Sequence, residues 1–368
     1  MNSFSTSTHC KNWIKTEKEL EKIEKSKLER ILKRISEVNM SIKKEYEEKS
    51  HNSINLITNQ PKNIITNEEG NPQANFRKYI TKKKLITPNE EMNLIIHYCG
   101  LLLHILNTNK DLKSSTLKNI SLTYFRRFFL KKSIIDYDII YLMAAAVFLG
   151  SKVAPINLNI QDIEKIFPAV KNSDKKFFDY EFFLCTILEY DFYVYNPYLA
   201  LMGFIFNLEQ KEFFLAQSSE NYVNPNEFQQ ECIDLIDKMY LTNNIFLFTY
   251  SEIALGSIFI KCEQKNISTI NIAEKLELDK VINVKEFLEG PLKKMKDNLD
   301  LIPKYENEEE REKMAHDIYK KLNYFHKSFP EYQKKLDEER RALKNKMKSF
   351  TDDFEVFEKP ILKSLAKK

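Results

Sequence analysis

The chain has 368 residues, of which 43% are hydrophobic and 12% aromatic, so it is long enough for two domains and is not disordered as a whole. Its six glycines are scattered, which excludes the clustered glycines of a phosphate-binding loop. The formal net charge of +4 is too small to indicate nucleic-acid or membrane binding by itself.

The dispersed cysteines and histidines predict no metal, cofactor or nucleophilic site. The five cysteines contain no CxxC pair, and the six histidines make no constellation with Cys, Ser or Asp. We expect a reducing compartment and no signal peptide. The longest apolar run, residues 139–150, has about half the length of a membrane span, so we expect a core helix there.

Residues 16–50 are predicted to form one charged helix. Thr16 and Glu19 have the spacing of a capping box, in which each side chain bonds the other residue's backbone N–H. An apolar stripe with three- and four-residue steps follows, made of Leu28, Ile31, Ile35, Val38 and Ile42. We expect the stripe to dock on the protein's own body, with a partner helix as the alternative. The polar residues 51–86 are predicted to be a linker or long loop.

The sequence TPNEEM, residues 87–92, predicts a helix start. Thr87 is the expected N-cap, Pro88 the first helical residue and Glu90 the second member of a capping box. The apolar face that follows is expected to contain Leu94, Tyr98, Leu101, Leu102 and Ile105.

The stretch TYFRRFFLKKS, residues 123–133, mixes aromatic rings with cations, so it could be a nucleic-acid patch or a core helix. Base-stacking rings would be exposed and interleaved with cations. Here the apolar side chains instead recur at helical steps and predict one buried stripe, formed by Leu117, Ile120, Tyr124, Phe125, Phe128 and Phe129. We therefore predict a core helix, with Arg126 and Arg127 at its margin.

The next predicted helix, residues 137–152, is apolar on nearly every side and must be surrounded by other helices. Small residues, Ala144 to Ala146 and Gly150, allow close approach, so this helix is predicted to be the hub of a bundle. A shorter helix is expected at 159–166 and a further helix at 175–190.

The pattern of predicted helices then repeats. The second hub helix is expected at 250–264, about 112 residues after the first. The other expected elements are helices at 197–209, 227–243 and 283–300 and a loop at 210–225. The sequence thus predicts an all-α protein with two tandem five-helix repeats. Charged helices are expected before the first repeat and after the second, the latter at 304–330 and 331–349.

These repeats resemble the cyclin fold. The stretch YFRRFFLKKS with AAAVFLGSK (124–133 and 144–152) looks like helices two and three of a cyclin box, and YEFFLCTILEYDFYVYNP (180–197) like its fifth helix and exit. TPNEEM and KNWIKTEKEL (11–20) are most similar to the cyclin H branch of the family, which also fits a cation at Arg126. The implied domains are an N-terminal helix and linker (1–88), two cyclin boxes (89–196 and 197–300) and a C-terminal extension (301–368).

The resemblance implies a regulatory subunit without enzymatic activity or cofactor. It would bind and activate a cyclin-dependent kinase of the CDK-activating type, in transcription and the cell cycle, by packing on the kinase αC helix. A third assembly subunit and the general transcription and repair factor complex are further implied partners, in the nucleus. Direct contact with nucleic acid or membrane is not expected.

The resemblance also assigns the kinase-binding residues. Lys152 ends helix three and Glu181 lies in helix five, where family members bind the kinase backbone near αC. The implied apolar slot beside them is formed by Leu149, Val153, Cys185, Tyr190 and Phe192. The alternative for the charged pair is a surface lysine with a solvated glutamate, and for the slot it is ordinary core.

Two other functions remain open at this point. One is a general transcription factor with tandem cyclin folds that binds DNA, although the chain lacks the N-terminal zinc ribbon and strongly basic face usual in such proteins. The other is a different transcriptional cyclin, which would share the mechanism and bind another kinase.

Overall fold

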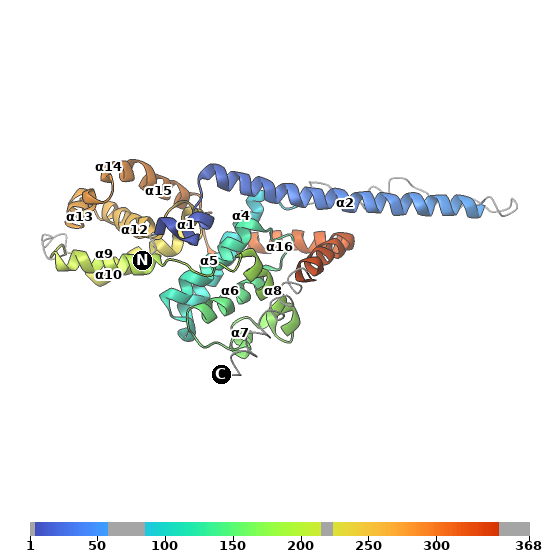
Figure 1. Ribbon diagram of the computed structural model, residues 1–368, viewed down its shortest axis with the longest axis horizontal. Coiled ribbons are helices and arrows are strands. Elements are labelled where there is room, and N and C mark those ends of the chain that lie inside the picture. The colour runs from blue at the N-terminus through green and yellow to red at the C-terminus, as the bar shows by residue number, and fades with distance from the viewer. Residues whose placement is uncertain (1–3, 58–84, 215–223, 346–368) are drawn as a thin grey trace, which may run out of the picture. The chain divides into compact units, whose positions relative to one another are not determined.

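The computed structural model describes residues 4–57, 85–214 and 224–345, which contain helices and turns and no strand (Figure 1). The predicted all-α class is thus confirmed. The chain divides into two compact units, which are described one at a time. The larger comprises residues 1–27 with 87–315, and the smaller comprises residues 28–86 with 316–368.

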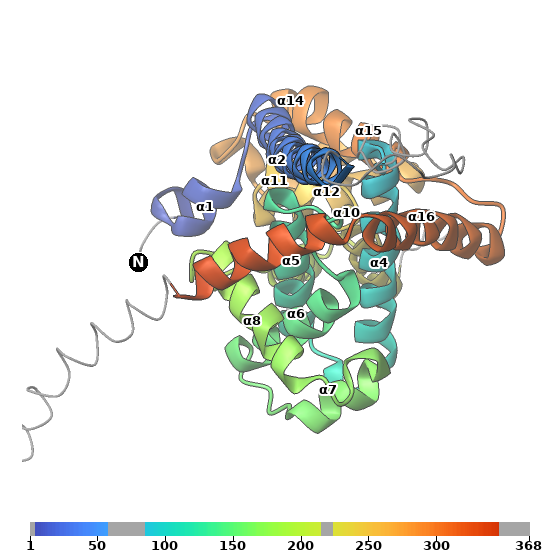
Figure 2. The ribbon, with the colours of Figure 1, turned by 90° about the vertical axis from the view of Figure 1, so that its right-hand side faces the viewer.

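The first repeat of the larger unit has five α-helices in the predicted order. They are α4 (Pro88–Thr108), α5 (Ser115–Lys131), α6 (Ile139–Val153), α7 (Ile160–Ile166) and α8 (Asp174–Ile187). Figures 1 and 2 both show α5, α6 and α8 side by side, with α6 in contact with both neighbours. The predicted start of α4 is confirmed, because the Thr87 N–H donates to Glu90 over 2.6 Å and the Glu90 N–H to Thr87 over 3.2 Å. Leu101 is exposed, so the expected apolar face of α4 is wrong at that position.

The second repeat follows the same order. It consists of α9 (Pro197–Gln210), α10 (Pro225–Met239), the short α11 (Asn244–Leu247), α12 (Tyr250–Gln264), α13 (Thr269–Lys275) and a bent fifth helix. That last helix joins α14 (Val284–Phe287), a π-helical turn (Leu288–Leu292) that contains Pro291, and α15 (Lys293–Asp300). The predicted pair of tandem repeats is confirmed. Of the loop expected at 210–225, residues 215–223 lie outside the described part.

The small residues of both hub helices allow close helix contact. A Cβ added at Gly150 in α6 would lie 2.7 Å from the Ser121 hydroxyl oxygen of α5. A Cβ at Gly256 in α12 would meet the thioether sulfur of Met295 in α15. Both hub helices therefore lie close to their neighbours, although at Gly256 the nearest atom belongs to the end of a flexible side chain.

Helix α5 is buried on every side from Leu117 to Leu130, so its prediction as a core helix is confirmed. The expectation that Arg126 and Arg127 lie at its margin is wrong, because both are buried. The second repeat covers one of them: the Arg126 guanidinium donates to the Thr242 carbonyl oxygen over 2.9 Å and to the Asn243 side chain over 3.0 Å. The helical pattern shows the apolar stripe, but it cannot show which distant segment covers the remaining faces.

A buried polar network also joins the two repeats. Lys118 of α5 lies 2.8 Å from a carboxylate oxygen of Asp237 on α10. The same carboxylate accepts the Tyr198 hydroxyl over 2.6 Å and the Asn107 side-chain amide over 3.2 Å. Because buried charges are costly unless they are paired and hydrogen-bonded, this network favours one relative position of the repeats.

The N-terminal helices of the larger unit are α1 (Thr8–Trp13) and the first turns of α2 (Glu17–Ile57). The Thr16 N–H donates to Glu19 over 2.7 Å and the Glu19 N–H to Thr16 over 3.3 Å, which confirms the predicted capping box. Leu20 packs with Leu130 and Phe246. The start of α2 therefore docks on the protein's own body.

The smaller unit contains the rest of α2, the second half of α16 (Glu308–Ser328) and a helix at 330–345. Arg34 forms a two-pronged ion pair with Glu339, at 3.0 and 2.8 Å, and donates to the Tyr332 hydroxyl over 2.8 Å. Ile31, Ile35 and Val38 are buried as expected, whereas Leu28 is exposed. Because α2 continues to Ile57, the linker expected at 51–86 is wrong up to that residue, and 58–84 lie outside the described part.

Candidate functional site

Lys152 and Glu181 form an ion pair between the last turn of α6 and the middle of α8. The Lys152 ammonium lies 2.5 Å from a Glu181 carboxylate oxygen and 4.1 Å from the centre of the Phe148 ring. The Lys152 side chain is 50% exposed, whereas that of Glu181 is 14% exposed. The pair thus combines an accessible cation, which lies over the Phe148 ring, with a largely buried carboxylate.

The five residues of the predicted slot differ in how far they are open to a partner. Leu149 is buried, Val153, Cys185 and Phe192 are half-buried, and Tyr190 is exposed. The rings of Tyr190 and Phe192 lie 6.0 Å apart, and the Tyr190 N–H donates to the Cys185 carbonyl oxygen over 3.1 Å. Burial first, and then the Glu181 charge, raise the pKa of the Cys185 thiol to about 11, so the thiol stays neutral near pH 7.

The exit segment, residues 189–195, is held from several sides. Lys131 pairs with Glu189 at 2.6 Å, and the Tyr124 hydroxyl donates to the Phe192 carbonyl oxygen over 2.6 Å. Glu189 and Tyr190 have φ angles of 56° and 57°, in the left-handed region that non-glycine residues rarely adopt. Backbone in this conformation persists only where its surroundings fix it, and these contacts supply such fixing.

Helix α1 supplies more of the contacts to the exit segment. The Asp191 carboxylate accepts the Thr8 hydroxyl over 2.8 Å and the Trp13 indole N–H over 3.2 Å. The Tyr195 N–H donates to His9 over 3.2 Å. Burial, with a smaller contribution from the Arg127 charge, lowers the pKa of His9 to about 3, so this imidazole is neutral and can accept.

Trp13 connects α1 to the buried helix α5. Its ring lies 4.4 Å from the guanidinium carbon of Arg127 and 4.4 Å from the ammonium nitrogen of Lys131. The sequence showed Trp13 only as part of a resemblance. The reason for an aromatic residue there becomes visible once α5 is seen to bring two cations beneath it.

The second repeat contains the corresponding ion pair with reversed polarity. Glu263 near the end of α12 pairs with Lys296 of α15, and their side chains are 42% and 37% exposed. Neither the Glu263 carboxylate nor the Lys296 ammonium is buried. Both repeats thus join their third and fifth helices by a charge pair, but of these two pairs only the first has a largely buried carboxylate.

Among the residues that the structure describes, no group of three His, Cys, Asp or Glu side chains could hold a metal ion. No helix in the described ranges is long and apolar enough to cross a membrane.

The chain is similar in sequence to curated cyclins. Cyclin-H of Xenopus laevis is 25% identical over 247 residues, which cover 66% of this chain and 72% of the relative. Cyclin mcs2 of Schizosaccharomyces pombe is 25% identical over 260 residues, which cover 70% of this chain and 68% of the relative. No protein-family model matches the chain.

Solved structures show the same fold. A chain of the CAK complex from Chaetomium thermophilum, bound to ATP-gamma-S, superposes with a TM-score of 0.58 at 18% identity and covers 94% of both chains. The chain is a cyclin H-like protein. A chain of the yeast TFIIK (Kin28/Ccl1/Tfb3) complex also superposes on this cyclin H-like chain, with a TM-score of 0.53 at 17% identity over 80% of it and 100% of the yeast chain.

Proposed function

We propose that the chain is the regulatory subunit of a cyclin-dependent kinase of the CDK-activating type, which acts in transcription and the cell cycle. The observation that carries the proposal is the Lys152–Glu181 pair, with its accessible ammonium and largely buried carboxylate, on a chain similar to cyclin H. The chain adds no catalytic group of its own and acts on the kinase's conformation.

The proposed mechanism is a shift of the kinase toward its active state. An active kinase has its αC helix turned inward, so that the αC glutamate pairs with the β3 lysine. A surface that contacts αC only in this orientation raises the population of the active state. Lys152 donates to a kinase carbonyl oxygen and Glu181 accepts from a kinase backbone N–H. The apolar slot beside them holds apolar side chains of αC.

The partners of the proposed complex are the kinase, a third assembly subunit and the general transcription and repair factor complex. Support comes from the likeness to chains of the CAK complex and of the TFIIK (Kin28/Ccl1/Tfb3) complex, the second of which has three named subunits. A complex that acts in transcription works in the nucleus, and we propose that location for this chain.

Direct DNA binding by α5, the alternative raised by its sequence, has less support. The cations Lys118, Arg126 and Arg127 are buried, and the first two bond to the second repeat. Cations in these positions cannot neutralise phosphates, which is the main source of affinity for DNA.

The test is the change Glu181→Ala, measured as affinity for the purified kinase and as kinase turnover. We expect binding to weaken by about 2–5 kcal/mol, because the change leaves charged or polar groups of the complex unpaired. Kinase activation should fall in parallel at fixed concentrations.

The second repeat offers a matched control, Glu263→Ala. It removes a carboxylate from the corresponding ion pair, and because both partners there are well exposed it should change affinity by less than about 1 kcal/mol. Equal affinities for the wild type and the Glu181→Ala variant would refute the assignment of this surface. A wild-type chain that binds no kinase would refute the proposed function itself.

A further inference from the structure

Helix α8 carries an apolar stripe that continues beyond the predicted slot toward the start of the helix. Phe178, Phe182 and Cys185 occur at steps of four and three residues, so they share one face of α8. Phe178 is 46% exposed, whereas Phe182 and Cys185 are half-buried. The slot implied by the resemblance includes Cys185 and neither phenylalanine. Two aromatic residues of this face therefore still need a role.

Phe178 is linked to the Lys152–Glu181 pair by two routes. Along α8 it precedes Glu181 by three residues, and residues at this spacing on a helix have Cβ atoms about 5–6 Å apart. Through the side chains, its ring lies 5.6 Å from the Phe177 ring, which lies 5.4 Å from the Phe148 ring. Phe148 is the ring beneath the Lys152 ammonium. The exposed ring thus belongs to the same contiguous surface as the ion pair.

A partner that binds the ion pair has to cover this end of α8 as well. A stable interface of standard size takes about 800 Å² from each partner, which is a patch with a radius of about 16 Å. Phe178 lies inside such a patch wherever Glu181 is more than about 6 Å from the rim. Rings that surround a central polar contact also exclude water from it, which strengthens the contact.

We propose that Phe178 and Phe182 bind the kinase, with an apolar side chain of the kinase packed against the Phe178 ring. The kinase-binding surface then extends along two turns of α8, from Cys185 back to Phe178, with Glu181 between them. This inference rests on the proposed function and deepens it, because it names contact residues that the resemblance did not supply. An aromatic ring buried on binding is the kind of contact that contributes most to interface affinity.

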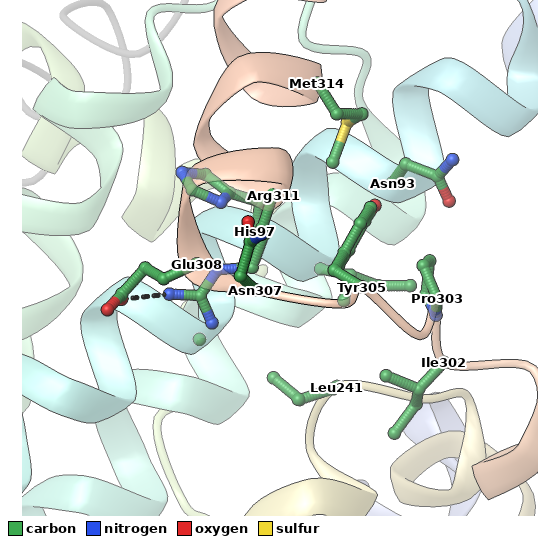
Figure 3. A pocket seen from close by; sticks show the side chains of 12 residues that line it. Asn93, His97, Leu241, Ile302, Pro303, Tyr305, Asn307, Glu308, Arg311 and Met314 are labelled. Atoms are coloured by element: carbon green, nitrogen blue, oxygen red, sulfur yellow. Dashed lines mark hydrogen bonds and ion pairs between the residues drawn. The ribbon is translucent and has the colours of Figure 1, made fainter.

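Helix α4 provides a matched control, because the chain covers part of its surface itself. Residues 302–314 lie against α4 and enclose with it a pocket of about 460 Å³ (Figure 3). Arg311 and Glu308 in the lining of this pocket pair with each other at 2.6 Å. Leu101 of α4 is 42% exposed, close to the value for Phe178, and belongs neither to this lining nor to the stripe of α8.

The direct test places the photo-crosslinking residue p-benzoylphenylalanine at position 178 of the full chain, in the complex purified from its native cells. Mass spectrometry identifies the crosslinked protein. We expect a crosslink to the kinase from position 178 and none from position 101. Crosslinks to the kinase from position 190 but not from position 178 would overturn the inference and leave the proposed function intact. A wild-type complex without kinase would refute the proposed function itself.

A second measurement titrates purified kinase with variants of the chain. We expect Phe178→Ser to raise the concentration for half-maximal activation about tenfold or more, because it removes apolar contact area. Phe178→Leu keeps an apolar side chain and should lose less. Leu101→Ser makes a similar change on α4 and should have no effect.

Far-UV circular dichroism checks that each variant is folded, which is expected because Ser and Phe have similar helix propensities and the Phe178 ring is well exposed. A folded Phe178→Ser variant that activates the kinase at the wild-type concentration would contradict the inference. Equal losses in Phe178→Ser and Leu101→Ser would contradict it too, because the effect would then not be specific to α8.

Discussion

The two repeats share an order of helices but differ at the place where their third and fifth helices meet. In the first repeat a largely buried Glu181 faces Lys152, and in the second an exposed Glu263 faces Lys296 with reversed polarity. The first repeat also leads into the exit segment, to which α1 is hydrogen-bonded. The fold fixes where such a pair can form, and the added segments decide whether it can serve as a binding surface.

The repeats also differ in how tightly their hub helices are held. Gly150 faces the short side chain of Ser121 on a fully buried helix, whereas Gly256 faces the flexible end of Met295. The first hub therefore has a stiff neighbour and the second an adaptable one. A stiff contact at the first hub helix agrees with the proposal that the first repeat presents its binding side chains in fixed positions.

Removal of the link between the repeats should have the largest effect on stability. Asp237→Ala leaves the Lys118 ammonium buried without its carboxylate, so we expect the free energy of unfolding to fall by about 3–5 kcal/mol. Urea unfolding followed by circular dichroism measures this. Asp234→Ala changes an exposed carboxylate on the same helix and should have little effect. Similar losses in both variants would show that the network does not join the repeats energetically.

The attachment of α1 to the exit segment should weaken in acid. The pKa of His9 is about 3 in the folded chain, against an ordinary value of 6.5 once the ring is exposed to water. The contribution of His9 to docking is therefore complete above pH 6.5 and is lost as the pH falls toward 3. At pH 4.5 we expect a loss of about 2–3 kcal/mol. Trp13 is the single tryptophan, so its fluorescence reports the docking of α1.

A matched variant isolates the contribution of His9. His9→Asn keeps a side-chain acceptor for the Tyr195 N–H and has no titrating ring, so its Trp13 signal should change less between pH 7 and 4.5. Identical pH curves for the two proteins would assign the transition to another group.

Alanine at the two hub glycines should separate the stiff repeat from the adaptable one. At Gly150 a methyl group would overpack against Ser121, which costs about 1–3 kcal/mol and outweighs the gain of about 1 kcal/mol in helix propensity. At Gly256 the Met295 side chain can move, so we expect a free energy of unfolding that is unchanged or slightly higher. Thermal unfolding of both variants measures the difference, and equal shifts would contradict it.

Local patterns predicted most of the helices, because the capping box at Thr87 and the apolar stripe of α5 depend only on residues near in sequence. They failed where distant segments meet. Nothing within residues 115–131 shows that Arg126 bonds to Thr242, or that Trp13 covers Arg127. Lys152 and Glu181 were each assigned by resemblance, but their contact with each other was not predicted. The reversed pair of the second repeat was missed, since charged residues near helix ends are common.

The bond from Arg126 to Thr242 has a consequence for how the chain is made. The two residues are 116 positions apart, so at about 5–20 residues per second the ribosome adds the acceptor roughly 6–23 seconds after the donor. During that interval the nascent first half holds the Arg126 guanidinium without the Thr242 carbonyl oxygen that accepts its hydrogen bond. The first half therefore cannot complete its packing until the second half has been synthesised. A fragment that ended at the repeat boundary would remain incompletely packed and would be expected to bind chaperones.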